Sequence, residues 1–498
     1  MTRQIAVLCA AALFAGCAHE KASETKTEQP AAQAAAPAAK ADGIIPITTS
    51  SPEAAAAYQE GFDWLFTGHG DRARERWHRA LELDPNLLLA QAWLQAISPG
   101  TASMQKVDAA AQAGAQLPEA ERTELMFIAA SKHGDDERIQ QLELKMLSLA
   151  PREPRAHVYA ALTALFTAHH PEEAAGHLRE AAALNPKATA PWALLAAVAD
   201  EQGDKAGVAE ARSKVAQMHP DDPAMQADYA NALLTAGKLD QAEQVARKAA
   251  AMPNADDKPL AALAGIELYK SEWAQGRQDL DKARSLATDP ARRLGLAEFG
   301  IMTHVAEGKY EAALDAASAL EAQAQEAKDP NFVVTAGIDR ALAGAMLGKY
   351  AEARKHVAAA LARAATDPLS DVGRKNLTRF GWFTQMWAEA LGNDAAAAEK
   401  TLAVLEKDAA DSPNDANVAS TAAWARGLYK LSKGDAKGAA EEMAKCLRSD
   451  DVCHFHLVLA QEKAGDKAAA QATRAALLAQ QRAQDGVYLA LRAQLLRQ

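Results

Sequence analysis

One spacing of residues returns about every 34 positions along this chain, and that period limits the possible folds more than any other feature. The first copy, residues 73–85, has the sequence A-R-E-R-W-H-R-A-L-E-L-D-P, and Gly61 and Trp64 precede it at matching positions. Pro186 and Pro220 lie 34 residues apart and close two successive copies. A fixed period of this length is typical of stacked helical hairpins, in which each hairpin covers the hydrophobic face of its neighbour.

Later copies are recognised by their turns. Residues 308–313 have the sequence G-K-Y-E-A-A, residues 348–353 have G-K-Y-A-E-A, and similar glycine-led turns begin at Gly434 and Gly465. Glycine suits the left-handed end of a helix, and the alanines that follow allow a close crossing of the next helix.

Together these motifs resemble the tetratricopeptide repeat (TPR) family over most of residues 50–482, with residues 88–118 as the poorest match. The resemblance implies an all-α, right-handed superhelical solenoid of helix-turn-helix repeats, with roughly twelve units. We expect an N-terminal array over residues 50–290, a C-terminal array over residues 291–484, and an amphipathic capping helix over residues 485–498.

Length and charge agree with a binding array. A chain of 498 residues exceeds one ordinary hydrophobic core, but a solenoid escapes this limit because each repeat contacts only its neighbours. The net charge of -11 argues against nucleic acid as a partner, since binding to phosphates requires a basic face.

The N-terminus predicts export. Residues 1–16 carry Arg3 before a short apolar run, which is typical of a signal peptide. The sequence L-F-A-G-C resembles the lipobox of bacterial lipoproteins, which implies cleavage before Cys17 and acylation of that residue. The alternative is an ordinary cleaved signal with an incidental cysteine. Residues 17–45 are rich in Ala, Pro, Thr, Lys and Glu and predict a disordered tether. We therefore expect a periplasm-facing lipoprotein, with Ala18 permitting transfer to the outer membrane.

Motifs for catalysis are missing from the sequence. It has no G-x-S-x-G, no glycine-rich phosphate loop and no H-E-x-x-H. We therefore expect no enzymatic activity, no cofactor and no metal site.

Cys446 and Cys453 remain once Cys9 leaves with the signal peptide and Cys17 is lipidated. Two cysteines in an exported chain suggest a disulfide, although free thiols stay an alternative. A bridge across so short a loop would add roughly 2–3 kcal/mol of stability. A metal site with His454 and His456 is disfavoured, because residues two apart point to different sides of a helix.

The TPR resemblance implies that the first helix of each repeat lines a concave groove. This groove lacks the Lys and Asn set with which some family members hold the C-terminal carboxylate of chaperones, so an amphipathic helix or extended segment is the expected ligand. The predicted groove residues are Tyr58, Phe62, Phe66, Tyr159, Phe166 and Asn231.

A second dense cluster combines Arg379 with Phe383 and Trp387, in a chain with only 5% aromatic residues. Phe383 and Trp387 fall on one helical face. The cluster has two interpretations: packing between repeats, or a partner-binding hot spot built on tryptophan and arginine.

From these features we expect a protein-interaction scaffold in the bacterial envelope, which binds a protein or peptide in its groove and is anchored by its lipid. A role in secretion, pilus or outer-membrane assembly rests on family analogy alone. The alternative is a periplasmic protein that binds a small ligand or peptide fragment.

Overall fold

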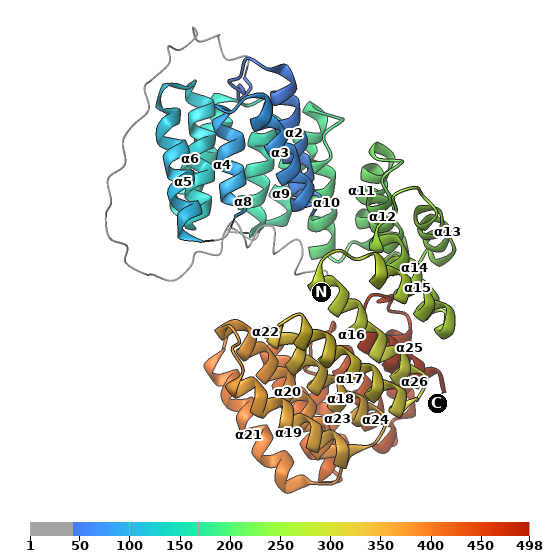
Figure 1. Cartoon of the computed structure of the whole chain (residues 1–498). Helices are drawn as coiled ribbons and strands as arrows, with labels where there is room; N and C mark the ends of the chain where they lie inside the picture. The colour runs from blue at the N-terminus through green and yellow to red at the C-terminus, as the bar shows by residue number, and fades with distance from the viewer. Residues whose placement is uncertain (1–42, 99, 167–169, 498) are drawn as a thin grey trace. The chain divides into compact units, whose positions relative to one another are not determined.

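Helical hairpins follow one another along the chain. The computed structural model describes residues 43–98, 100–166 and 170–497, and within these ranges every regular element is a helix. Helices α2 to α25 pair into twelve hairpins (Figure 1), which confirms the all-α repeat solenoid predicted from the sequence period. The predicted signal peptide, Cys17 and residues 18–42 lie outside the described residues.

The chain divides into two compact units at Pro220 and Asp221. The boundary expected after residue 290 therefore falls within the second unit. The first unit contains α2 Pro52–Phe66, α3 Gly70–Leu83, α4 Leu88–Ala96, α5 Thr101–Ala113, the short 3-10 helix η1 Gly114–Gln116, α6 Glu119–His133, α7 Asp136–Leu149, α8 Pro154–Phe166, α9 Pro171–Leu184, α10 Ala190–Glu201 and α11 Lys205–Met218.

The second unit continues the same alternation and ends with one extra helix. It contains α12 Pro223–Thr235, α13 Leu239–Ala250, α14 Asp257–Tyr269, α15 Trp273–Leu286, α16 Pro290–Ala306, α17 Tyr310–Glu326, α18 Pro330–Met346, α19 Tyr350–Thr366, α20 Asp371–Leu391, α21 Ala395–Asp411, α22 Ala416–Ser432, α23 Ala436–Met443, α24 Asp451–Lys463, α25 Lys467–Leu478 and α26 Gly486–Arg497. No helix in the described ranges is long and apolar enough to cross a membrane.

Local sequence explains where the helices begin and end. Aspartates at the N-caps accept hydrogen bonds from the first free backbone N–H groups, as Asp329 does before α18 and Asp415 does before α22. Gly308 and Gly348 take positive φ values of 77° and 74° between the helices of their hairpins, which is the left-handed conformation that the turn motif predicted.

Close approach within a hairpin depends on small residues. A Cβ atom on Gly61 of α2 would lie 2.4 Å from Nε1 of Trp77 on α3, so glycine is what allows the indole to sit there. Trp77 is fully buried and donates a hydrogen bond from Nε1 to the Tyr58 carbonyl oxygen (3.1 Å). The residues that marked the first sequence repeat therefore hold its two helices together.

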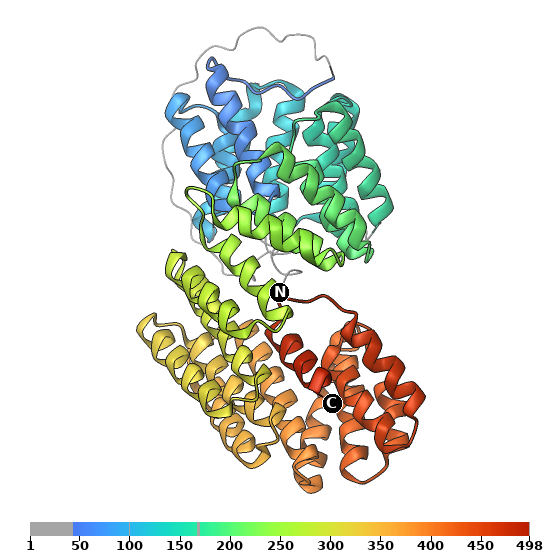
Figure 2. The same cartoon turned by 90° about the vertical axis from the view of Figure 1, so that its right-hand side faces the viewer.

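The C-terminal helix packs against more of the second unit than the last hairpin. Helix α26 packs against α16 as well as α24 and α25, and Figure 2 shows it enclosed by the other helices of its own unit. Six of its residues are at least 95% buried: Tyr488, Leu489, Ala490, Leu491, Ala493 and Leu495. The helix predicted as a terminal cap is thus part of the interior of the second unit.

Candidate functional site

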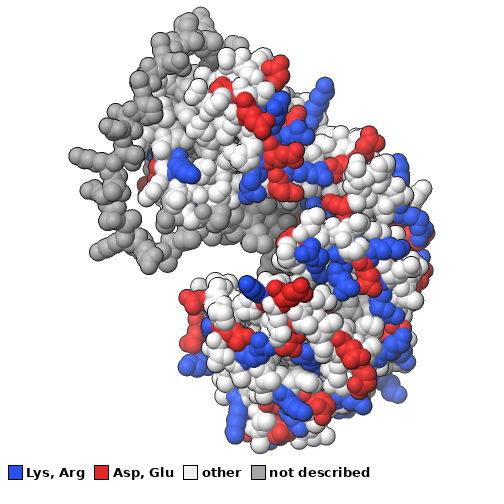
Figure 3. Space-filling model, viewed as in Figure 1, with Lys and Arg blue, Asp and Glu red and all other residues white. Residues whose placement is uncertain are grey.

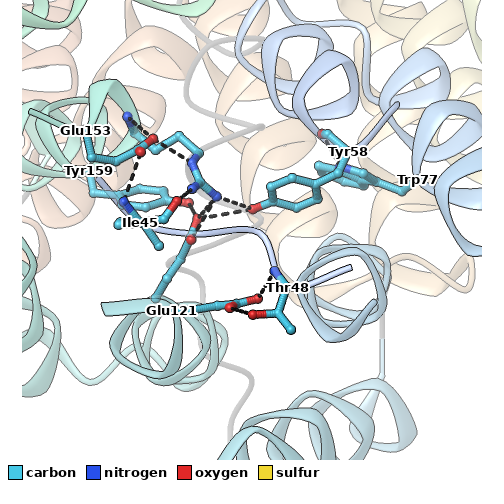
Figure 4. A network of polar contacts seen from close by, with 9 residues as sticks. Ile45, Thr48, Tyr58, Trp77, Glu121, Glu153 and Tyr159 are labelled. Atoms are coloured by element: carbon cyan, nitrogen blue, oxygen red, sulfur yellow. Dashed lines mark hydrogen bonds and ion pairs between the residues drawn. The ribbon is translucent and has the colours of Figure 1, made fainter. Parts of the chain in front are cut away.

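The interior of the first unit holds a buried ionic network around Arg155 of α8 (Figure 4). Its guanidinium group donates to both carboxylate oxygens of Glu124 (2.9 and 3.1 Å) and to Oε1 of Glu153 (2.7 Å). The hydroxyl groups of Tyr58 and Tyr159 also donate to Glu124. Burial raises the pKa of the Glu124 carboxyl, and Arg155 opposes that rise.

This network also fixes the segment that precedes α2. The carbonyl oxygen of Ile45 accepts a hydrogen bond from Arg155, and its N–H donates to Glu153 (2.7 and 3.1 Å). The N–H of Thr48 donates to Glu121 (2.9 Å), a pair that Figure 4 also shows. Ile45, the last residue assigned to the predicted tether, is 2% exposed and is therefore part of the packed first unit. The sequence pattern missed this because the fixing partners lie about 70 to 110 residues away.

Three of the predicted groove residues lie in the interior of the first unit. Tyr58, Phe62 and Tyr159 are at most 2% exposed. The rings of Phe62 and Tyr159 contact each other and Trp93, and the Arg155 guanidinium lies over the ring of Tyr58. Phe66 is partly buried beside Phe62 (ring centroids 4.9 Å apart). These side chains are buried among their neighbours and do not line an open groove, and α10 packs against α2 in the same unit. The side chain of Phe166 lies outside what the structure describes.

In the second unit, the predicted groove face is covered by the C-terminal segment of the same chain, residues 479–497. The predicted groove residue Asn231 accepts a hydrogen bond from Gln484 (3.0 Å). Arg492 donates to the carbonyl oxygen of Tyr269 (2.9 Å) and lies over its ring, and Gln494 donates to the carbonyl oxygen of Met346 (3.1 Å). The segment therefore bridges α12, α14 and α18.

One cavity of about 510 Å³ remains beside this segment, and we call it the inner cavity. Its walls come from helices α18, α20, α21, α22 and α24, from the loop before α24, and from the C-terminal segment. The lining residues are Leu342, Asn376, Arg379, Phe380, Phe383, Leu405, Asp408, Asn417, Val418, Ser420, Thr421, Leu447, Ser449, Asp450, Asp451, Val452, Arg482, Asp485, Val487 and Tyr488.

The second predicted cluster is divided between this cavity and the core. Arg379 lines the cavity while its guanidinium group pairs with Asp408 (2.7 Å) and Asp415 (3.4 Å). Phe383 also lines it and stacks on Trp424, with ring centroids 4.3 Å apart. Trp387 is 2% exposed and lies in the core. Two of the three residues are thus placed to contact a ligand, and the third supports the packing behind them.

A disulfide joins Cys446 and Cys453 behind one wall of the inner cavity. The loop between them contributes Asp450, whose carboxylate accepts hydrogen bonds from the Ser420 hydroxyl (2.8 Å) and the Cys453 N–H (3.0 Å). The Ser420 hydroxyl oxygen in turn accepts from the Leu447 N–H (3.0 Å). The bridge and these hydrogen bonds connect the loop before α24 to α22 and to the first turn of α24.

His454 and His456 take different positions, as their spacing predicted. His456 is fully buried, with its ring against Trp387 and Trp424. Burial lowers the pKa of His456 to about 4, so its imidazole is neutral at pH 7. The nearby group of Cys446, Asp450 and Cys453 has the geometry of a metal site, but its two sulfur atoms are bonded to each other.

Asp451 is a buried charged residue of the cavity wall that the sequence did not reveal. It is 6% exposed, and burial raises the pKa of its carboxyl to about 6, against the opposing effect of Arg482 (Nη1 to Oδ2, 3.0 Å). The sequence offered only the run S-D-D at a predicted turn, where aspartates are ordinary helix caps. Asp451 lines a cavity wall only because residues 482–488 pack beside it, and no local sequence pattern shows that contact.

No family model matches the chain, and no curated protein sequence matches it. Solved structures are similar only at a distance. A tetratricopeptide repeat protein from Parabacteroides merdae is 14% identical with a TM-score of 0.30, and the match covers 49% of this chain and 98% of that one.

Two further structures resemble a larger share of the chain. Yeast Tom70 is 14% identical with a TM-score of 0.43 and coverage of 85% and 96% of the two chains. The APC/C hetero-tetramer Cut9-Hcn1 is 16% identical with a TM-score of 0.35 and coverage of 88% and 79%. Likenesses this distant carry no argument about function, and the repeat architecture rests on the chain's own helical pairs.

Proposed function

We propose that this protein is an interaction scaffold of the bacterial envelope, anchored by a lipid on Cys17, that binds a peptide segment of a partner protein at the inner cavity. The cavity is the observation that carries the proposal. It is the space left on a face otherwise filled by the C-terminal segment, and it combines aromatic side chains with several fixed polar groups. Sites of this composition bind ligands through apolar contact and are oriented by their polar groups.

The lining supports a peptide as the ligand. Phe380 and Phe383 supply apolar surface, while Asn417 and Thr421 supply side-chain hydrogen-bonding groups. An extended or helical segment needs both, because its side chains bury apolar area while its polar groups require partners. On the face shown in Figure 3, basic and acidic residues are interspersed, and neither positive nor negative charge forms one large patch. The proposed binding site therefore rests on the lining of the cavity and not on the charge of the visible surface.

A photo-crosslinking amino acid at Asn417 tests this function in intact cells. Asn417 is exposed and lines the cavity, so we expect covalent adducts to a discrete protein, identified by mass spectrometry of the crosslinked peptide. That peptide, once synthesised, should bind the purified chain. The same amino acid at Glu399, which is exposed on α21 and does not line the cavity, should give no such adduct.

The alternative function, binding of a small molecule, is favoured by one observation. A cavity of about 510 Å³ has the size of many small-ligand sites. A small molecule that co-purifies with the chain, together with no protein adduct from position 417, would support this alternative and contradict the scaffold proposal.

The proposed anchor has its own test. Replacement of Cys17 by serine removes the thiol that the lipobox resemblance assigns to acylation. We expect the variant to lose fatty-acid labelling and to leave the membrane fraction, while the helical content of the repeats is unchanged. Retention in the membrane fraction without labelling would count against a lipid anchor. Separation of inner from outer membranes in the unaltered strain assigns the compartment.

A further inference from the structure

Two acidic side chains are buried together in the hairpin of α14 and α15. Glu267 of α14 is 2% exposed and Asp279 of α15 is 4% exposed, and their carboxyl groups form a hydrogen bond with each other. An ionised carboxylate can only accept hydrogen bonds, so this contact requires a proton on one of the two groups. The pair is therefore a proton-binding site in the interior of the hairpin.

The surrounding contacts indicate which group carries the proton. Asp279 accepts hydrogen bonds from Lys282 (2.7 Å) and Gln275 (3.2 Å), one at each carboxylate oxygen, which suits its ionised form. Glu267 Oε2 is buried, and no donor reaches it among the described residues. An oxygen of this kind is less costly in a neutral acid than in a carboxylate. Glu267 is therefore the group that donates to Asp279.

The electrostatic surroundings of Glu267 favour the same assignment. Burial raises the pKa of the Glu267 carboxyl from 4.5 to about 7, and the charge and hydrogen bond of Asp279 add to that rise. Glu272 acts in the same direction, and Arg247 of α13 opposes it. Because the pKa is raised above its value in an unfolded chain, the proton stabilises the folded form at acidic pH, and this contribution decreases between about pH 4.5 and 7.

The other charged groups on the helices around α14 have partners of their own. Glu243 of α13 accepts hydrogen bonds from Arg247 (2.7 Å) and Lys270 (3.1 Å), and Arg492 of α26 donates to the carbonyl oxygen of Tyr269 (2.9 Å). None of these cations is paired with Glu267, so an ionised Glu267 would gain no salt bridge from them in this arrangement.

Helix α14 also carries the C-terminal segment. Gly265 and Tyr269 lie two residues before and two after Glu267. A Cβ atom on Gly265 would lie 2.8 Å from the carbonyl oxygen of Ala483, and the Tyr269 hydroxyl donates to the carbonyl oxygen of Gln480 (3.2 Å). Residues two apart point to different sides of a helix, so α14 contacts Asp279 of α15 on one side and the segment on another. A shift of α14 away from α15 therefore also changes the surface on which the segment docks.

We propose that the carboxyl pair of Glu267 and Asp279 makes the second unit sensitive to pH, because loss of the shared proton drives α14 from α15 and loosens the C-terminal segment. Two adjacent carboxylates then repel each other in a place where water does not solvate them. The segment supplies Arg482 and Tyr488 to the inner cavity, so the same proton affects the wall of that site. The inference does not depend on which ligand the cavity binds.

Hydrogen exchange of the full chain, measured by mass spectrometry and corrected for the intrinsic effect of pH, tests the inference. Glu267→Gln keeps a donor for Asp279 at every pH. At about pH 8 we expect the amides of α14, α15 and residues 479–497 to be at least about tenfold more protected in Glu267→Gln than in the parent chain, whereas at about pH 5.5 the two should agree. Glu326→Gln, at an exposed position on α17, should behave as the parent chain at both pH values.

A titration of the unaltered chain guards against a variant that only repacks. With carbon-13 in the glutamate side-chain carboxyl groups, NMR should show one resonance, absent from Glu267→Gln, that titrates near pH 7 and not near 4.5. A Glu267 resonance that titrates near 4.5 would overturn the inference, as would equal protection of α14 in the parent and Glu267→Gln chains at about pH 8.

Discussion

Replacement of Arg155 by methionine is expected to destabilise the first unit by about 3–5 kcal/mol, because it leaves buried carboxylates without their cation. Arg155 is 1% exposed and Glu124 is fully buried, so water cannot replace the lost partner. The change also removes the donor to the Ile45 carbonyl oxygen, which frees the segment before α2. Hydrogen exchange measured by mass spectrometry should show faster exchange in α2, α6 and α8.

An exposed arginine provides the control. Arg79 pairs with Glu82 at 2.9 Å, but both side chains are more than half exposed, so Arg79→Met should change stability by less than about 1 kcal/mol. Unfolding in urea, followed by tryptophan fluorescence, compares the two variants with the parent chain. Equal stabilities for both would mean that the network around Glu124 contributes nothing to the fold.

The repeat fold was predictable because its signals are local. A glycine such as Gly308 marks the left-handed turn, and small residues such as Gly61 and Ala73 mark the crossing of two neighbouring helices. Residues 88–118 matched the repeat pattern poorly, yet they form the hairpin of α4 and α5. That hairpin is recovered through packing on its neighbours, which overrides a weak local signature.

The site was only partly predictable because it depends on residues that meet from far apart in the sequence. Arg379 and Phe383 were predicted because aromatic and basic residues are unusually dense in that part of the sequence, and both line the inner cavity. It missed Asp451 because burial, not sequence, makes that carboxylate unusual. It also assigned Tyr58 and Tyr159 to an open groove, since a repeat pattern does not show that α10 returns to α2.

The C-terminal segment shows the same limit. Residues 485–498 have an apolar pattern that predicted a helix, and α26 confirms the helix itself. A terminal cap would keep one polar face in water, whereas Tyr488, Leu489, Ala490 and Leu491 are four consecutive buried residues. Consecutive burial of this kind means that the helix is surrounded, and it supports a larger structural role than that of a cap.

Truncation after Ala479 is expected to abolish the cooperative unfolding of the second unit. The deleted residues include Tyr488, Leu489, Leu491 and Leu495, each at least 95% buried, and the loss of their burial corresponds to about 6–10 kcal/mol. A loss of this size equals the whole stability of many domains. We expect fast hydrogen exchange in α14, α16 and α18, and a loss of ellipticity at 222 nm beyond that of the deleted helix.

Two single substitutions test the docking of the segment without deleting it. A Cβ atom on Gly265 would lie 2.8 Å from the carbonyl oxygen of Ala483, so Gly265→Ala should destabilise the second unit by about 1–3 kcal/mol. Gly295 lies in α16 with no atom within 4 Å of such a Cβ, so Gly295→Ala should stabilise it by about 0.5–1 kcal/mol. If both variants were equally stable and the truncated chain kept slow exchange in α14 and α16, the C-terminal segment would be dispensable. The inner cavity would then lose the wall made by Arg482 and Tyr488, and its assignment as a binding site would fail with it.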